Sequence, residues 1–355
     1  MNSEICHIMV VFECERVKVP NTGIYYFCRN LAHALIAEMS GEKEFELGFF
    51  LRRRNKGIFG PDVRYLLYKS IYKYIFPYWL MKGGVWHTTF QYPQIMPSRG
   101  NVVLTVHDLN FLYENTPEQG KRLLSLLQRN VDRASVIVAI SEYVKQDIMR
   151  HLDLKGKEIK VIYNGCEEYA GELKEPDEKP EGEFILTLGA TMGKKNVHVL
   201  PCLLKDNDLH LVIVGEKVSP YADKILGDAV QWGVTDRVHF TGAVGEDLKH
   251  WYLAHCRAFV FPSIAEGFGL PVLEAMYYGK PVFLSCFTSL PEIGKDKAFY
   301  FNKDFDRKLM QKEFAEGLRR FDAGEITPEQ IKEHARSFSW KIAAKKYLNL
   351  YKSMI

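Results

Sequence analysis

The chain has 355 residues and a hydrophobic fraction of 47%, which fit two globular domains of about 100–200 residues each. Lys and Arg number 47 against 44 Asp and Glu, so the net charge of +3 gives no general case for binding nucleic acid. Seven scattered cysteines without a C-x-x-C pair are typical of reduced thiols and not of a zinc site. No signal-peptide pattern and no apolar run of about 18 residues is present, so we expect a cytoplasmic protein.

Residues 6–12 form an apolar run that predicts the first strand, and a helix pattern follows from Ile24 to about Met39. Gly23 stands directly before this helix, at a place where a glycine allows backbone to approach a ligand closely. Taken alone, this glycine is better explained by a simple turn.

Residues 52–82 combine basic and aromatic side chains at near-helical spacing, with Asp62 as the single acid. Such a segment suits anionic lipid headgroups, so it is a candidate for peripheral membrane contact. It equally suits an acceptor site, where aromatic faces stack on sugar rings. The third interpretation is a solvated basic helix whose aromatic stripe packs on its own domain. The sequence leaves all three open.

The apolar run 102–106 predicts a strand that ends at His107 and Asp108. A histidine at the carboxyl end of a parallel strand points toward the ligand crevice of such folds, although a lone histidine is more often packed and satisfied locally. A helix over 121–131 follows, Ser141 is predicted to cap the next helix, and further strands are predicted at 135–139 and 160–163.

Residues 170–182 are charged and punctuated by proline and glycine, which predicts a linker. Beyond it, a strand over 184–188 leads to Gly189 and then to Lys194 and Lys195. Lysines just past a strand can pair with phosphate, but an ordinary loop with surface lysines explains the local string about as well.

The stretch 258–294 organises the second half of the chain. A short apolar strand over 258–261 is followed by the loop Glu266-Gly267-Phe268-Gly269 and by Pro271, which suits the first turn of a helix. That helix is predicted to run to a cap at Gly279, before a strand at 281–284. The string from Ser289 to Glu292 predicts a capping box for another helix.

A glycine-rich loop that runs into a helix N-terminus attracts phosphate, because unpaired N–H groups and the positive dipole end meet there. Glu266 in the loop and Glu274 on the helix cannot bind phosphate themselves. They suit hydroxyl groups on either side of it, which predicts a nucleotide-sugar. Either glutamate alone would be taken as a surface or dipole-complementing acid, but the strand–loop–helix frame favours the functional interpretation.

Glu266 and Glu274, with FGLPVLEA around and between them, resemble the E-x7-E signature of retaining glycosyltransferases of family 4. The resemblance implies the GT-B architecture, an α/β fold with two Rossmann-like, doubly wound domains facing a cleft. It implies an acceptor-side domain over 1–169, the linker 170–182 and a nucleotide-sugar-binding domain over 183–338. A final helix in 339–355 would pack back on the first domain, its alternative being to pack on its own domain.

The resemblance also implies roles for individual residues. Glu266, His107 and Lys195 would be catalytic, and Asp108 would lie on the acceptor side or fix the tautomer of His107. The donor-binding residues would be Gly23, Gly189, Lys194, Lys195, Gly215, Glu216, Val244, Glu266, Gly267, Phe268, Gly269, Leu270 and Glu274. No metal and no cofactor would be required, because Lys195 and the N-terminus of the helix at Pro271 would stabilise the leaving diphosphate.

The expected reaction is transfer of a hexose from a nucleotide-sugar to a glycan or lipid-linked acceptor in surface polysaccharide biosynthesis. GDP-mannose is the favoured donor and a UDP-sugar the alternative. The enzyme would work in the cytoplasm, at the inner membrane face if residues 52–82 contact lipid. Three other functions are possible for such a fold. A Rossmann dehydrogenase would need a G-x-G-x-x-G motif after the first strand, which this sequence lacks. The other two are a GT-B phosphorylase or free-sugar transferase, and a non-catalytic scaffold.

Overall fold

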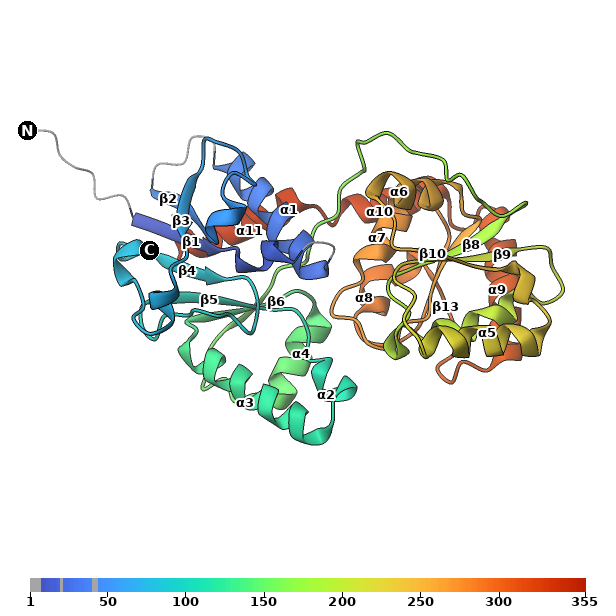
Figure 1. The fold of residues 1–355 in the computed structure, drawn as a ribbon, viewed down its shortest axis with the longest axis horizontal. Coiled ribbons are helices and arrows are strands. Elements are labelled where there is room, and N and C mark those ends of the chain that lie inside the picture. The colour runs from blue at the N-terminus through green and yellow to red at the C-terminus, as the bar shows by residue number, and fades with distance from the viewer. Residues whose placement is uncertain (1–7, 20–21, 40–43) are drawn as a thin grey trace, which may run out of the picture. The chain divides into compact units, whose positions relative to one another are not determined.

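The computed structural model describes residues 8–19, 22–39 and 44–355. Cys6, in the predicted first strand, lies outside the described residues. The chain divides into two compact units, Met1–Gly165 together with Phe338–Ile355, and Cys166–Ser337. Each unit is built on a parallel sheet with helices on both faces (Figure 1). Among the described residues, no helix combines the length and the apolar character that crossing a bilayer requires.

The first unit holds a seven-stranded sheet of order β3-β2-β1-β4-β5-β6-β7. Its strands are β1 (Ile8–Glu13), β2 (Phe45–Leu51), β3 (Arg64–Leu67), β4 (Val85–Thr88), β5 (Asn101–Val106), β6 (Val136–Ala139) and β7 (Ile159–Val161). All their pairings are parallel. The chain adds strands outward from β1 on one side and then from β4 on the other, so the topological switch point lies between β1 and β4.

Helices cover both faces of this sheet because parallel crossovers are right-handed and the direction of strand addition reverses. The helices are α1 (Gly23–Glu38), α2 (Phe111–Glu114), α3 (Pro117–Arg133), α4 (Glu142–His151) and α11 (Trp340–Lys352). The last of these packs beside α1 (Figure 1). The hydroxyl of Tyr351 lies 2.6 Å from Nδ1 of His87, and that of Tyr347 lies 3.2 Å from Thr105 Oγ1. The C-terminal helix is therefore part of the first unit.

The second unit holds a six-stranded parallel sheet of order β10-β9-β8-β11-β12-β13. Its strands are β8 (Phe184–Leu188), β9 (His210–Val214), β10 (Val238–Gly242), β11 (Ala258–Phe261), β12 (Val282–Leu284) and β13 (Phe299–Tyr300). Its helices are α5 (Tyr221–Trp232), α6 (Glu246–His255), α7 (Leu270–Tyr277), α8 (Leu290–Gly294), α9 (Arg307–Asp322) and α10 (Pro328–Arg336). A 3-10 helix, η6 (Val197–Leu204), follows β8 and packs against α5 and α9.

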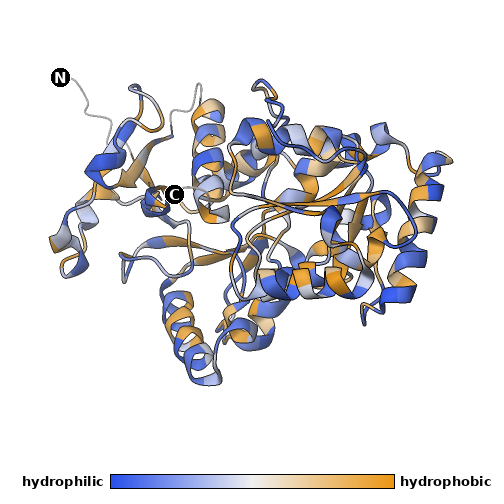
Figure 2. Ribbon diagram, turned by 45° about the vertical axis from the view of Figure 1, so that its right-hand side comes forward, coloured by the Kyte–Doolittle hydropathy of each residue, from blue (hydrophilic) through white to orange (hydrophobic). Residues whose placement is uncertain are grey.

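The central strands of both sheets are buried on both sides, which explains their continuous apolar runs. Every residue of β8 and of β11 is buried. Figure 2 shows the hydrophobic residues concentrated on the strands and on the helix faces turned toward them. The cores thus hold the strand ends in place, and the functional residues follow those ends.

Several local predictions are confirmed. Ser141, Thr327 and Ser339 cap their helices through the side chain, with a complete capping box at Thr327. Pro271 lies in the first turn of α7, and Gly279 follows the helix end with a φ of 68°.

Other predictions are wrong. Residues 52–82 form no α-helix: they contain β3 and short 3-10 turns, because Gly57, Gly60 and Pro77 interrupt the segment. The two compact units separate at Gly165 and Cys166, whereas the boundary was expected at 169. The predicted linker contains no helix or strand, and its residues 174–180 line a cavity on the second unit, so the domain boundaries stay a prediction. Strands β2, β4 and β13 were not predicted, being short or lacking clear turn signals.

Candidate active site

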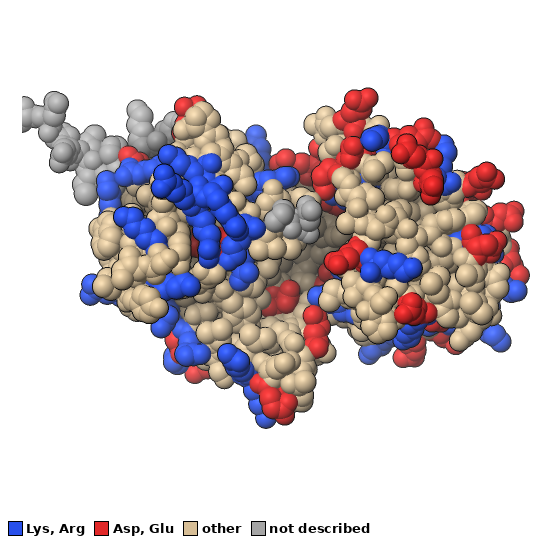
Figure 3. Space-filling view, in the orientation of Figure 1, with Lys and Arg blue, Asp and Glu red and all other residues tan. Residues whose placement is uncertain are grey.

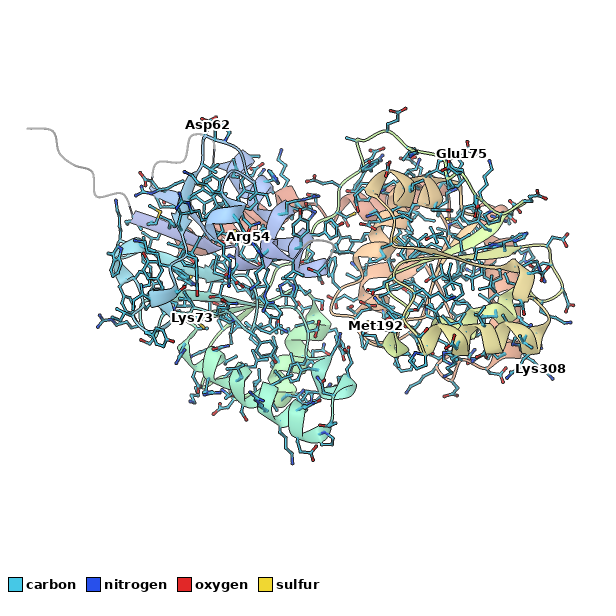
Figure 4. All side chains as sticks on the ribbon, viewed as in Figure 1. Arg54, Asp62, Lys73, Glu175, Met192 and Lys308 are labelled. Atoms are coloured by element: carbon cyan, nitrogen blue, oxygen red, sulfur yellow. The ribbon has the colours of Figure 1, made fainter. Side chains whose placement is uncertain are left out.

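The switch point of the second sheet lies between β8 and β11, so the loops after these two strands run side by side. The N–H of Ile264 donates to the carbonyl of Lys194 at 2.8 Å. The hydroxyl oxygen of Ser263 lies 3.1 Å from the same carbonyl oxygen. Open α/β sheets bind ligands at this place, outside the carboxyl ends of the strands. Figure 4 labels Met192, which lies in the loop after β8.

Lys195 and Glu266 meet across this switch point although 71 residues separate them. Nζ of Lys195 lies 2.6 Å from Oε1 of Glu266, and the hydroxyl of Ser263 donates to the same oxygen at 2.6 Å. Nζ also lies 4.9 Å from the centroid of the Phe261 ring. The two charged side chains are 17% and 14% exposed, so the pair is shielded and yet accessible from the crevice. A shielded ammonium of this kind interacts strongly with a second anion.

Hydroxyl side chains hold the loop that carries Glu266. Thr288 Oγ1 accepts from the N–H of Glu266 at 3.1 Å. The hydroxyl of Ser289 shares its one proton between the carbonyl oxygens of Glu266, at 3.1 Å, and Phe268, at 2.8 Å. The capping box predicted at Ser289 is wrong, because the backbone of Ser289 is helical, with φ −79° and ψ −10°, and its side chain accepts no hydrogen bond from an N–H of α8. Sequence reasoning missed the loop-holding role of Ser263, Thr288 and Ser289.

Gly269 links this loop to α7 in a conformation that only glycine adopts readily. Its φ is 114°, and a Cβ at this position would lie 2.9 Å from Cδ2 of Leu290. The tight turn starts α7 at Leu270, directly after the loop. The positive end of the α7 dipole consequently faces the loop in which Glu266 lies.

Glu274 lies on α7 and is held by α6. Nζ of Lys249 lies 3.0 Å from Oε1 of Glu274 and 3.0 Å from Oε2 of Glu246. The two carboxylates raise the pKa of Lys249 against the opposing effect of burial, so the ammonium is charged. Sequence reasoning missed Lys249, and no local signal could have found it, since the contact joins two helices.

The residues expected near the nucleobase also lie at the carboxyl edge of the second sheet. Gly215 has a φ of 147°, and a Cβ there would lie 2.3 Å from the carbonyl oxygen of Gly189, so these two loops require glycine to approach. The carbonyl of Glu216 accepts from Thr191, while its side chain is exposed. Val244 lines a cavity of about 770 Å³ whose other wall is residues 174–180.

In the first unit, His107 follows β5 and is buried. Its Nε2 lies 2.8 Å from the carbonyl oxygen of Thr89, and since a carbonyl only accepts, Nε2 carries the proton. Burial lowers the pKa of His107 to about 4, so the ring is neutral near pH 7. Thr89, and not Asp108, therefore sets its tautomer; Oδ1 of Asp108 accepts from the N–H of Asn110 at 3.0 Å. His107 is thus suited to accept a hydrogen bond through Nδ1 and not to act as a cation.

Gly23 is exposed at the first position of α1, and no atom lies within 4 Å of the Cβ that a side chain would add there. The hydroxyl of Thr22 accepts from the N–H of Tyr25 and caps the helix. Packing therefore does not require a glycine at position 23.

Glu13, the last residue of β1, is a buried carboxyl group at the switch point of the first sheet. Burial raises its pKa from 4.5 to about 7. Because this folded-state pKa lies above the unfolded value, ionisation of Glu13 lowers stability as pH rises from 4.5 through 7. We expect Glu13→Gln to raise the free energy of unfolding above pH 7 by roughly 3 kcal/mol, and to have no such effect at pH 4.5 or below.

Thermal unfolding of the two proteins, compared at each pH, measures this difference. Glu118→Gln on α3 is the control, since Glu118 is exposed and should leave the midpoint unchanged. If wild type and Glu13→Gln have equal unfolding midpoints above pH 7, ionisation of Glu13 does not lower the stability of the folded protein and this prediction fails. The comparison must be made at constant pH, since burial lowers the pKa of His87 to about 3 and that of His107 to about 4. The stability from these two histidines is present above pH 6.5 and is lost as pH falls toward their folded values.

The chain matches two family models, glycosyl transferases group 1 over residues 171–338 and glycosyltransferase family 4 over residues 84–168. It is similar to the O-antigen chain mannosyltransferase RfbU of Salmonella typhimurium, with 30% identity over 67% of this chain and 68% of that protein. The serotype-specific mannosyltransferase WbdA of Escherichia coli is 32% identical over 59% of this chain, which corresponds to 28% of that longer protein.

Among solved structures, the fold is similar to that of sucrose-phosphate synthase from Thermosynechococcus elongatus. The TM-score is 0.72 at 16% identity, over 98% of this chain and 99% of that one. The residues matched by the two family models include His107, Lys195, Glu266 and Glu274. The chain belongs to glycosyltransferase family 4, has the GT-B architecture and is a hexosyltransferase.

Proposed function

We propose that the protein transfers a mannosyl residue from GDP-mannose, with retention of anomeric configuration, to a glycan or lipid-linked acceptor of a surface polysaccharide. The observation that carries the proposal is the contact between Lys195 and Glu266 at the switch point, beside the N-terminus of α7. The mannosyl donor is supported by the names of the relatives, RfbU and WbdA, which are mannosyltransferases.

Lys195 and the start of α7 supply positive potential for the leaving diphosphate. As the bond between the sugar carbon and the phosphate oxygen breaks, negative charge grows on the diphosphate. Lys195 then exchanges the carboxylate of Glu266 for the diphosphate, and the backbone N–H groups around Gly269 add hydrogen bonds. These groups perform the charge stabilisation that a metal ion performs in other transferases, so we propose that no metal is required.

Glu266 then orients the donor sugar through its hydroxyl groups, and Glu274 accepts hydrogen bonds from the ribose. Each carboxylate is already positioned, Glu266 by Ser263 and Glu274 by Lys249. Fixed acceptors of this kind reduce the entropy lost on binding. Gly215, Glu216 and Val244 would border the base. We assign the acceptor to the first unit, to Asp108 at the carboxyl edge of its sheet, and propose that the neutral His107 is catalytic through a hydrogen bond that its Nδ1 accepts.

The transfer needs no enzymatic nucleophile. The acceptor hydroxyl attacks the anomeric carbon from the face that the diphosphate leaves, so a bond to the acceptor oxygen forms as the bond to phosphate breaks. The hydroxyl proton passes to an oxygen of the leaving phosphate. Anomeric configuration is thereby retained, and Glu266 does not become covalently attached.

Thermal unfolding with GDP, UDP, ADP and their sugars, each with and without EDTA, tests the donor. A ligand that binds the native state raises stability by RT ln(1 + [L]/Kd), about 2.7 kcal/mol at 100-fold saturation. We expect GDP and GDP-mannose to raise the midpoint, and EDTA not to reduce the shift. A shift with UDP alone would replace the donor by a UDP-sugar, and a shift lost in EDTA would contradict metal-free binding. If no nucleotide shifts the midpoint while inorganic phosphate supports sugar release, the protein is a phosphorylase.

A further inference from the structure

The crossover from β3 to β4, residues 68–84, covers one face of the first sheet without an α-helix. It contains two 3-10 turns, Ser70–Lys73 and Tyr78–Leu80, joined by an irregular segment. Tyr72 is buried against the sheet, and the Phe76 ring lies 4.9 Å from that of Trp86. Inward aromatic side chains therefore anchor the crossover to the hydrophobic core.

The outward side of the same crossover exposes large hydrophobic side chains. Tyr74 is 85% exposed, Trp79 63%, Ile75 62% and Ile71 53%. A single exposed hydrophobic residue needs no explanation, but such a group within nine positions forms a patch of the kind that marks an interaction site. Because the core anchors the inward residues, the crossover cannot turn these outward side chains inside.

Cationic side chains lie in the same crossover as this apolar patch and in the segment next to it. The crossover itself carries Lys69, Lys73 and Lys82, and Arg99 lies 4.6 Å from the ring of Tyr78. Three more cations, Arg53, Arg54 and Lys56, follow the end of β2. This end is joined to the start of the crossover by a hydrogen bond from the N–H of Tyr68 to the carbonyl of Leu51. All of these cations are exposed. Figure 3 shows Lys and Arg gathered on this face of the first unit, and Figure 4 labels Arg54 and Lys73.

Most of these cations have no ion pair with another described residue. In the part of the chain that the structure describes, no carboxylate pairs with Arg53, Arg54, Lys56, Lys69, Lys73 or Lys82. By contrast, Arg52 pairs with Glu15, and Arg64 with Glu46. We call this region the basic–aromatic surface; it consists of Ile71, Tyr74, Ile75 and Trp79 with the exposed cations named above. It is thus both apolar and positively charged.

We propose that the basic–aromatic surface binds the anionic headgroups of a phospholipid bilayer and holds the enzyme on the membrane. Lys and Arg are attracted to anionic lipid within a Debye length, and Trp and Tyr are enriched at the depth of the headgroups. A second copy of the chain fits less well, because a symmetric contact would bring the two sets of cations against each other. The inference does not depend on the identity of the sugar donor.

Co-sedimentation of the full chain with vesicles of phosphatidylcholine, alone or mixed with phosphatidylglycerol, tests this proposal. We expect binding only to the anionic vesicles and weaker binding at high salt. Each charge removed should lower the partition coefficient about fivefold, so Lys69→Gln with Lys73→Gln should lower it about 30-fold. Tyr74→Ser with Trp79→Ser should also release the protein. Matched controls on the second unit, Lys308→Gln with Lys312→Gln and Val230→Ser, should bind as wild type does.

All the substituted side chains are exposed, so unchanged thermal midpoints would show that the variants fold. The proposal is overturned if the wild-type protein does not bind anionic vesicles, or if the double lysine variant binds them as tightly as the wild type. It is also overturned if the variants instead convert an oligomer into monomers without lipid, because the surface then joins copies of the chain. The thermal shift by nucleotide should stay unchanged in every variant, which separates failure of this proposal from failure of the proposed donor.

Discussion

Replacement of Lys195 by methionine is expected to lower kcat for mannosyl transfer by about 10²–10³-fold, the usual effect of removing one charge-stabilising donor. The ammonium of Lys195 lies 2.6 Å from Glu266 at the switch point and is the cation that the loop after β8 presents there. Its attraction to the diphosphate grows as the bond to the sugar breaks. The loss should consequently appear in kcat more than in KM, in steady-state kinetics with GDP-mannose.

Two comparisons make this result specific. Lys224→Met removes an exposed lysine of α5 and should leave kcat unchanged. Because Lys195 and Glu266 contact each other, Lys195→Met with Glu266→Gln should lose less activity than the product of the single losses. Full activity of Lys195→Met, or strict additivity of the two losses, would contradict the proposed exchange of Lys195 between carboxylate and diphosphate.

Replacement of Glu274 by alanine is expected to weaken GDP binding on the order of 100-fold, because hydrogen bonds to a charged group contribute about 1.5–3 kcal/mol each. Isothermal titration of the folded protein measures this loss directly. Lys249→Met should weaken GDP binding less, about tenfold, since the carboxylate remains but is no longer positioned. The same substitution leaves Glu246 and Glu274 without their shared cation, so stability should fall by about 2–3 kcal/mol, somewhat less than for a fully buried pair.

The double variant Lys249→Met with Glu274→Gln separates the binding role of Glu274 from its structural role. Neutralising Glu274 as well leaves only the more exposed Glu246 without its cation, so the thermal midpoint should recover in part relative to Lys249→Met. The affinity for GDP should not recover, because the carboxylate is gone. If Glu274→Ala binds GDP as tightly as wild type, the ribose site lies elsewhere and the assignment fails.

The stretch 258–279 was predictable because its signals are local. A buried strand, a two-glycine loop, a proline in the first helical turn and a glycine after the last turn each constrain the backbone by themselves. The caps at Ser141, Thr327 and Ser339 belong to the same class, since a hydroxyl side chain bonds to an N–H only three residues away.

The failed predictions share a physical cause. Ser289 has the local pattern of a cap, but its backbone is helical and not extended, and its hydroxyl points to the carbonyls of Glu266 and Phe268. Residues 52–82 have aromatic spacing near that of a helix, yet Tyr68, Tyr72 and Phe76 pack on the sheet from a crossover that contains no α-helix. In both places tertiary contacts outweigh a local preference worth about 1 kcal/mol.

The sequence by itself determined the two parallel-sheet domains and the motif residues Lys195, Glu266 and Glu274, because apolar runs and turn residues act over a few neighbouring positions. Only the tertiary structure decided that Lys195 meets Glu266 and that Lys249 holds Glu274. Those contacts depend on which strands are neighbours and on how α6 packs beside α7. Strand order and helix packing are set by burial of the whole core, over distances that no local pattern in the sequence records.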